Sequence, residues 1–194
     1  MHDPNQLPDD LPVPVDDGAC AHLPDQAMPR LRLASTDGGT VDLAELSAPR
    51  TVLYCYPRTG VPGQPLPSGW DDIPGARGCT PQSCSFRDHH AELRALGADV
   101  YGISTQPTDY QQQMVARLRL PFAVLSDADC ALADAMMLPT LTVDGMRLIK
   151  RLTLIVRDGR IEMVFYPVFP PDRSAATVVE WLENNPTTTL SSAH

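Results

Sequence analysis

Two cysteines and a proline near the middle of the chain form the pattern with the clearest chemical meaning. Cys79 stands immediately before Thr80-Pro81, and Cys84 follows five residues later. Proline is accepted in the first turn of a helix and threonine is a favourable cap, so the pattern predicts a helix that begins at Thr80. Unpaired N–H groups at a helix start favour negative charge, and the thiolate is the reactive form of cysteine. The sequence therefore predicts that Cys79 is a redox nucleophile.

The spacing of the two cysteines limits how they can react with each other. Five residues advance a helix by about 7.5 Å and turn it by about 500°, which leaves the two side chains roughly 140° apart. A disulfide needs converging Cβ atoms and Cα atoms within about 7 Å. Cys79 and Cys84 therefore cannot bond while the helix is intact. If they do bond, the first turns must unwind, so the spacing predicts two conformations.

Composition and charge narrow the class of protein. The 194 residues are enough for one domain with a proper core, and the formal net charge of -9 argues against a nucleic-acid partner. The start of the chain has no secretory hydrophobic segment, and no run approaches the length of a membrane span. An odd count of five cysteines favours a reducing compartment. We expect a cytoplasmic protein with no membrane association and no structural disulfides.

Strand and helix patterns alternate along the chain and predict an α/β fold with a mixed central sheet, flanked by helices and preceded by a β-hairpin. We expect a flexible arm over residues 1–22, one domain over 23–185 and a flexible tail over 186–194. Cys79 should lie beyond the carboxyl end of the first core strand. The predicted elements begin with a hairpin over 30–40 and a short strand edge with one helical turn over 41–46, and continue with strands at 51–56, 98–104 and 122–125 and helices at 80–96, 107–120 and 127–137. An irregular segment at 139–149 with a turn at Asp144-Gly145, a hairpin over 152–166 and a helix at 172–183 complete them.

The segment 57–78 is rich in proline and glycine and ends directly at Cys79. A loop of this length inside a compact domain is usually functional or disordered. Trp70 in its middle indicates that it packs on another part of the domain.

The remaining cysteines have simpler interpretations. Cys55 lies in a buried strand pattern and is expected to act as a small hydrophobic side chain. Cys130 is expected to be a buried helical cysteine, although a third redox thiol would also fit. Cys20 lies in the arm and receives no role. Cys79 and Cys84 could ligate a metal with His89 and His90, but their spacing is not usual for zinc, so we expect no metal.

The two histidines beside each other, His89 and His90, are expected to be solvated or half-buried rather than catalytic. Arg87 could orient the Cys79 region or simply pair with an acidic neighbour on the surface, and the sequence leaves both interpretations open.

Four segments together resemble a known family. The run Gly78–Asp88 resembles the G-C-T-x-x-x-C-x-F-R-D signature of Q-type peroxiredoxins, also called bacterioferritin comigratory proteins. The run Leu53–Pro57 looks like the strand that ends in Y-P before the active-site loop of that family. The run Gly97–Ser104 is similar to its G-A-x-V-x-G-I-S strand, and Arg151–Gly159 to its R-x-T-x-x-I-x-D-G segment. The resemblance covers roughly residues 23–184.

The resemblance implies a thioredoxin-like fold and a thiol peroxidase that acts on hydrogen peroxide or organic hydroperoxides. Cys79 would be the peroxidatic cysteine and Cys84 the resolving cysteine, which closes an intramolecular disulfide with it. A thioredoxin- or glutaredoxin-like donor would reduce that disulfide. Arg151 would hold the thiolate and the peroxide oxygens. No metal, haem or flavin is required.

One departure from the family pattern concerns the loop before Cys79. The family has a proline seven residues and a hydroxyl residue three residues before the cysteine, whereas this chain has Asp72 and Ala76 there. Pro57 and Thr59 stand upstream of an apparent insertion of about fifteen residues. We hypothesise that the loop folds back, so that Pro57 shields the pocket and Thr59 supplies the hydroxyl. Equally, a backbone group or Thr80 could replace a hydroxyl that has been lost.

Two other functions remain open at this stage. A disulfide reductase is disfavoured because the chain has no C-x-x-C motif. A redox-sensing or thiol-exchange binding module, whose disulfide changes shape for a partner, is the main alternative. No unusually apolar exposed element argues for an obligate partner, so a monomer is expected, and a dimer is compatible with the same sequence.

Overall fold

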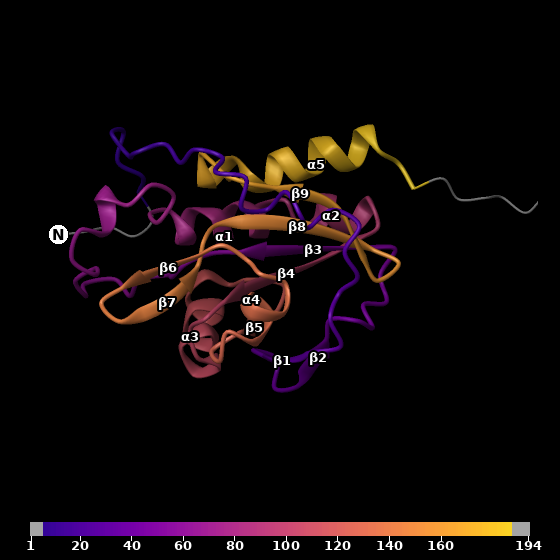
Figure 1. The fold of residues 1–194 in the computed structure, drawn as a ribbon, viewed down its shortest axis with the longest axis horizontal. Helices are drawn as coiled ribbons and strands as arrows, with labels where there is room; N and C mark the ends of the chain where they lie inside the picture. Colours follow the sequence, from indigo (N-terminus) through magenta and orange to yellow (C-terminus); the bar gives the residue numbers. More distant parts are fainter. Residues whose placement is uncertain (1–5, 188–194) are drawn as a thin grey trace, which may run out of the picture.

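The structure is a computed structural model that describes residues 6–187. A seven-stranded sheet runs through it in the order β2-β1-β5-β4-β3-β8-β9, and a separate hairpin pairs β6 with β7 (Figure 1). The strands are β1 (Arg32–Ser35), β2 (Thr40–Asp42), β3 (Arg50–Cys55), β4 (Ala98–Ser104), β5 (Val124–Ser126), β6 (Thr140–Val143), β7 (Met146–Ile149), β8 (Leu152–Arg157) and β9 (Arg160–Phe165). The helices are α1 (Cys79–Asp88), α2 (His90–Ala95), α3 (Thr108–Leu118), α4 (Ala131–Ala135) and α5 (Ser174–Asn184), with short 3₁₀ turns η1 (Trp70–Asp72) and η2 (Pro171–Arg173).

The predicted mixed sheet and its N-terminal hairpin are confirmed. Strands β3, β4 and β5 are parallel to one another, whereas β1, β8 and β9 pair antiparallel with their neighbours. All six residues of β3 are buried, as its continuous apolar run predicts for a central strand covered on both faces. Val52 and Tyr54 face the core shared with α1, α2, α3 and α5, and Leu53 and Cys55 face the core shared with α4. This alternation follows from the two-residue period of a strand.

The segment 139–149 was predicted to be irregular, and this prediction is wrong. It forms the β6–β7 hairpin, with Asp144 and Gly145 at φ 49° and 75° in a two-residue turn. The loop before Cys79 packs against this hairpin, because Trp70 and Ala76 share a small core with Val143 and Leu148. Two segments that each lack a strong period therefore bury their apolar side chains against each other.

Two predicted helices differ in detail from the observed ones. The helix expected over 80–96 begins at Cys79 and breaks into α1 and α2 at His89, whose φ and ψ of -97° and 5° leave the helical range. A His89 ring nitrogen lies 2.9 Å from the Ser85 carbonyl oxygen, which holds the side chain against the last turn of α1. Cys130, expected within a helix, instead precedes α4 at φ 56° and is only partly buried.

The segment expected to be a flexible arm contacts the domain at several points in its described part, although most of its residues are exposed or only partly buried. Asp17 accepts hydrogen bonds from Lys150 Nζ at 3.2 Å and from the Tyr166 hydroxyl at 2.9 Å, and Cys20 is only 6% exposed. Residues 1–5 of the arm and residues 188–194 of the expected tail lie outside the described residues. Between residues 6 and 187, none of the helices has both the length and the apolar composition needed to cross a membrane.

Candidate active site

Cys79 lies at the start of α1, as its neighbours predict. Gly78 precedes it at φ 102°, and the first helical hydrogen bond runs from the Gln82 N–H to the Gly78 carbonyl at 2.9 Å. The Cys79 side chain is 3% exposed. Its sulfur lies 3.5 Å from the Ala76 carbonyl oxygen and accepts a hydrogen bond from Arg151 at 3.2 Å. A buried cysteine therefore meets both a helix N-terminus and a guanidinium.

Arg151 immediately precedes β8, and it is 3% exposed. Its Nη2 donates to the Cys79 sulfur and to the carbonyls of Ala76 and Arg77, at 3.2 and 3.0 Å, and its Nη1 donates to Gln82 Oε1. None of these partners carries a formal negative charge while Cys79 is a thiol. These bonds hold the guanidinium in one orientation against the Cys79 sulfur, as its planar fork of donors permits.

Gln82 is a member of the site that the sequence interpretation missed. Its Oε1 accepts from Arg151, and its Nε2 donates to the Ser174 hydroxyl of α5 at 3.2 Å. Gln82 therefore fixes the guanidinium by linking it to a second helix. The sequence does contain a signal for Gln82, namely its position three residues after Cys79, because residues three apart on a helix are neighbours on one face.

Thr59 and Cys79 line the same small cavity, of about 10 Å³, together with Thr80. The loop therefore brings Thr59 to the same cavity as the cysteine, although nineteen residues of sequence lie between them. The Thr59 hydroxyl hydrogen-bonds Gln106 Oε1 at 3.2 Å. Pro57 is buried but is not one of the residues that line this cavity. Ala76 contributes its carbonyl oxygen, which contacts both Arg151 and Cys79.

Cys84 lies on α1 and is half-buried, and no disulfide joins it to Cys79. Burial raises the pKa of the Cys84 thiol, an effect that the nearby Arg87 guanidinium partly opposes. Cys84 therefore remains a thiol in the folded helix and is a poor nucleophile there. Arg87 itself pairs with Asp88 at 2.8 Å and also donates to the Leu118 carbonyl at the end of α3 at 3.0 Å, so it combines an ion pair with a contact between two helices.

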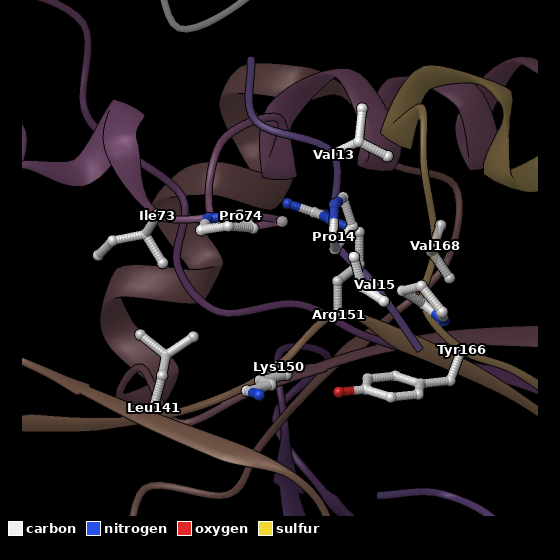
Figure 2. A pocket seen from close by; sticks show the side chains of 12 residues that line it. Val13, Pro14, Val15, Ile73, Pro74, Leu141, Lys150, Arg151, Tyr166 and Val168 are labelled. Carbon is white, nitrogen blue, oxygen red and sulfur yellow. The ribbon is translucent and has the colours of Figure 1, made fainter. Parts of the chain in front are cut away.

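Arg151 also lines a second and larger cavity, of about 320 Å³ (Figure 2). Figure 2 shows Val13, Pro14 and Val15 of the N-terminal segment on one side of it and Leu141 opposite. Cys79 does not line this larger cavity, so a molecule bound there would not contact the Cys79 sulfur. The N-terminal segment nevertheless contacts the chain before Cys79, because Arg77 Nη2 donates to the Gln6 carbonyl at 3.3 Å.

Among the described residues, no other cysteine and no histidine lines the cavity at Cys79. Cys55 is fully buried, as predicted, and burial raises the pKa of its thiol. Burial also raises the pKa of the Cys20 thiol to about 12. His90 is half-buried, and burial lowers its pKa. Within the described ranges, no group of three or more His, Cys, Asp or Glu side chains is arranged to hold a metal ion.

We expect that replacing Gly78 with alanine destabilises the start of α1 more than the same change at another glycine of the loop. Gly78 and Gly63 both have positive φ, but a Cβ at Gly63 meets no atom within 4 Å, whereas one at Gly78 would overlap Pro171 and lie 2.9 Å from Leu7. The positive φ alone costs about 1 to 2 kcal/mol in each variant. Overpacking should add about 1 to 3 kcal/mol in Gly78→Ala only.

Urea unfolding of the two glycine variants measures this difference. Equal free energies of unfolding for Gly63→Ala and Gly78→Ala would show that the close approach of Pro171 to Gly78 carries no stability.

Comparisons with known proteins find similarity over most of the chain. The redoxin family model matches residues 23–179. Peroxiredoxin Bcp of Escherichia coli K12 is 30% identical over 163 residues, which cover 81% of this chain and 93% of that protein. The chloroplastic peroxiredoxin Q of Populus jackii is 26% identical over 159 residues, covering 82% of this chain and 67% of that protein. The crystal structure of peroxidoxin BcpB from Mycobacterium tuberculosis superposes with a TM-score of 0.69 at 25% identity, over 84% of this chain and 98% of that one.

The family model matches most of the chain, and the relatives named peroxiredoxin Bcp and peroxiredoxin Q align with 81% and 82% of it. The mixed sheet flanked by helices agrees with the thioredoxin-like fold that the motifs imply. The chain therefore belongs to the redoxin family and, within it, to the Bcp or Q-type peroxiredoxins, which are thiol peroxidases.

Proposed function

We propose that Cys79 is the peroxidatic cysteine of this thiol peroxidase and that Cys84 resolves the oxidised form. The observation that carries the proposal is the 3.2 Å contact from Arg151 Nη2 to the Cys79 sulfur, inside a buried site at the start of α1. A fixed guanidinium and a helix N-terminus both stabilise a thiolate. The same guanidinium can donate to peroxide oxygens that enter beside the sulfur.

The first step transfers one oxygen atom from the peroxide to sulfur. The Cys79 thiolate attacks the terminal oxygen of a hydroperoxide, the S–O bond forms and the O–O bond breaks. The leaving oxygen takes the electron pair and a proton and departs as water from hydrogen peroxide or as an alcohol from an organic hydroperoxide. Sulfur is oxidised to sulfenic acid while the peroxide is reduced.

The second step joins the two cysteines and requires the start of α1 to open. The Cys84 sulfur attacks the sulfenate sulfur, the S–S bond forms and the hydroxyl leaves as water. Because burial keeps Cys84 protonated in the folded helix, unwinding also exposes it for deprotonation. The opening must release Cys79 from Arg151 and separate Gln82 from Ser174.

A dithiol protein of the thioredoxin or glutaredoxin class completes the cycle by thiol–disulfide exchange. One thiolate of the donor attacks the disulfide, a mixed disulfide forms, and the second donor thiol releases the reduced chain. The disulfide requires the start of α1 to be unwound, so the donor reacts with this opened form of the chain.

Rapid mixing of the reduced protein with micromolar hydrogen peroxide tests the proposed function. We expect near-stoichiometric oxidation of Cys79, located by mass spectrometry, followed by steady turnover when a thioredoxin-type donor is present. Oxidation no faster than that of free cysteine would contradict the peroxidase and favour a sensor or binding module.

Replacing Cys84 with serine should separate the two steps. The variant is expected to consume one equivalent of peroxide at a rate close to that of the unaltered protein, because Cys79 and Arg151 are unchanged. The sulfenic acid should then persist and react with a dimedone-type reagent, and dithiol-driven turnover should fall by about tenfold or more. A disulfide that still forms within the Cys84→Ser chain would show that another cysteine resolves Cys79.

A further inference from the structure

Thr59 is held by two side chains, Gln106 from the loop that follows β4 and Tyr110 from α3. Gln106 Oε1 accepts hydrogen bonds from the Thr59 N–H at 3.0 Å and from its hydroxyl at 3.2 Å. Gln106 Nε2 donates to the Thr59 carbonyl at 3.1 Å, and the Tyr110 hydroxyl donates to the same carbonyl at 2.8 Å. Thr59 is 1% exposed and Gln106 is 7% exposed. Every polar group of Thr59 is therefore bonded to this pair of side chains.

The place of Gln106 in the fold explains how it reaches Thr59. Strands β3 and β4 are parallel neighbours, so their carboxyl ends meet at one edge of the sheet. Thr59 follows the end of β3 and Gln106 follows the end of β4. The backbone of Gln106 is itself fixed, because its carbonyl accepts from the Ser126 hydroxyl at 2.7 Å and its N–H donates to Ser104 Oγ at 3.3 Å.

These contacts determine which way the Thr59 hydroxyl donates. The amide of Gln106 can be oriented in only one way, because a backbone N–H requires an acceptor and a backbone carbonyl requires a donor. Its Oε1 has no proton, so the Thr59 hydroxyl must be the donor in the bond between them. A hydroxyl has one proton and two lone pairs, so the Thr59 oxygen can act only as an acceptor toward the cavity that it shares with Cys79.

Arg151 cannot provide a hydrogen-bond acceptor in this site. The terminal oxygen of a hydroperoxide carries a proton, and a guanidinium offers only donors. We propose that Gln106 is a positioning residue that holds the Thr59 oxygen as the hydrogen-bond acceptor for the O–H of the bound hydroperoxide. This inference rests on the proposed function of Cys79. Gln106 touches neither sulfur nor peroxide and acts through Thr59 alone.

The proposal makes a specific kinetic prediction. The rate constant for oxidation of Cys79 by hydrogen peroxide should fall by about tenfold to a hundredfold in Gln106→Leu, the usual scale for loss of a reactant's orientation. The rate constant for alkylation of Cys79 by iodoacetamide should stay within about twofold, since alkylation needs the thiolate but no acceptor for a peroxide proton. General loosening of the fold would change both rate constants together.

Gln111 provides a matched control. It is also a buried glutamine, and its Nε2 donates to the Ser104 carbonyl, the Ser104 hydroxyl and the Leu125 carbonyl. Its side chain makes three hydrogen bonds, as that of Gln106 does, and it does not contact Thr59. The Ser104 hydroxyl also accepts from the Gln106 N–H, but the Gln106 side chain and its bonds to Thr59 are unchanged in Gln111→Leu. Gln111→Leu should therefore lose stability while the ratio of the peroxide and alkylation rate constants stays unchanged. A fall of that ratio equal to the fall in Gln106→Leu would overturn the proposal.

A double-mutant cycle tests whether Gln106 acts through Thr59. The combined Thr59→Val and Gln106→Leu variant should react with peroxide no more slowly than Thr59→Val alone, since the acceptor is already absent. Gln106→Asn keeps an amide but is one methylene shorter, and it replaces Gln106→Leu if the leucine variant fails to fold. Additive losses, or an unchanged peroxide rate in Thr59→Val, would overturn the proposal. Slow peroxide oxidation of the unaltered protein would instead contradict the proposed function itself.

Discussion

A protein with serine in place of Cys79 is expected to lose peroxide turnover by about 10³-fold or more, which is the scale of removing a nucleophile. The physical reason is that a serine hydroxyl at this position remains protonated and cannot be oxidised to a sulfenic acid. Arg151 and the start of α1 would still bind the peroxide oxygens, but no atom in the cavity could accept the oxygen. The measurement is steady-state peroxide consumption with a dithiol donor, supported by a stopped-flow trace without the donor.

The matched control for Cys79→Ser is Cys130→Ser. Cys130 is a partly buried free cysteine that stands immediately before α4, and serine is a favourable residue at a helix cap. This control should retain peroxide turnover within about twofold, because Cys130 is not among the residues that line the Cys79 cavity. Loss of activity in Cys130→Ser together with retained activity in Cys79→Ser would place the reactive sulfur elsewhere.

The second large effect is expected for Arg151→Lys, which keeps the charge but removes the fork of donors. Arg151 makes contacts with Gln82, two carbonyls and the Cys79 sulfur at once, whereas an ammonium is a compact charge on a flexible stem. The rate constant for peroxide oxidation should fall by about 10²- to 10³-fold, as when a fixed transition-state donor is lost. Alkylation of Cys79 by iodoacetamide should fall less, because it needs no donor fork for peroxide oxygens and the lysine keeps a positive charge at this position.

Arg50→Lys is the control for loss of a buried arginine. Arg50 is 2% exposed and binds both carboxylate oxygens of Glu162 at 2.7 Å, at the opposite end of β3 from the site. The hydrogen bonds from Arg50 are the main cause that lowers the pKa of Glu162. Arg50→Lys should lower the free energy of unfolding while the peroxide rate stays within about threefold. An equal fall of the peroxide rate in both lysine variants would mean that Arg151 acts through stability alone.

Local patterns in the sequence were enough to predict most of the sheet and the position of Cys79. The predicted strand 98–104 is identical to β4, and the predicted buried strand at 51–56 corresponds to β3. These elements depend on residues within a few positions of one another, such as the apolar run of β3 and the Cys-Thr-Pro start of α1. The position of Cys79 at the helix start is likewise a local property, since the Cys-Thr-Pro sequence itself specifies it.

The contacts that complete the candidate site lie beyond the reach of local patterns. Arg151 meets Cys79 across 72 residues, and Gln106 meets Thr59 across 47. The loop before Cys79 and the segment 139–149 have weak periodicity, because their apolar side chains face each other rather than the main sheet. The N-terminal segment, predicted as loose from its prolines, is held by Asp17, whose partners come from residues near the ends of β8 and β9. Neighbouring residues thus encode the reactive cysteine, whereas the folded topology decides which distant donors and acceptors surround it, since strand order alone brings those loops to one edge.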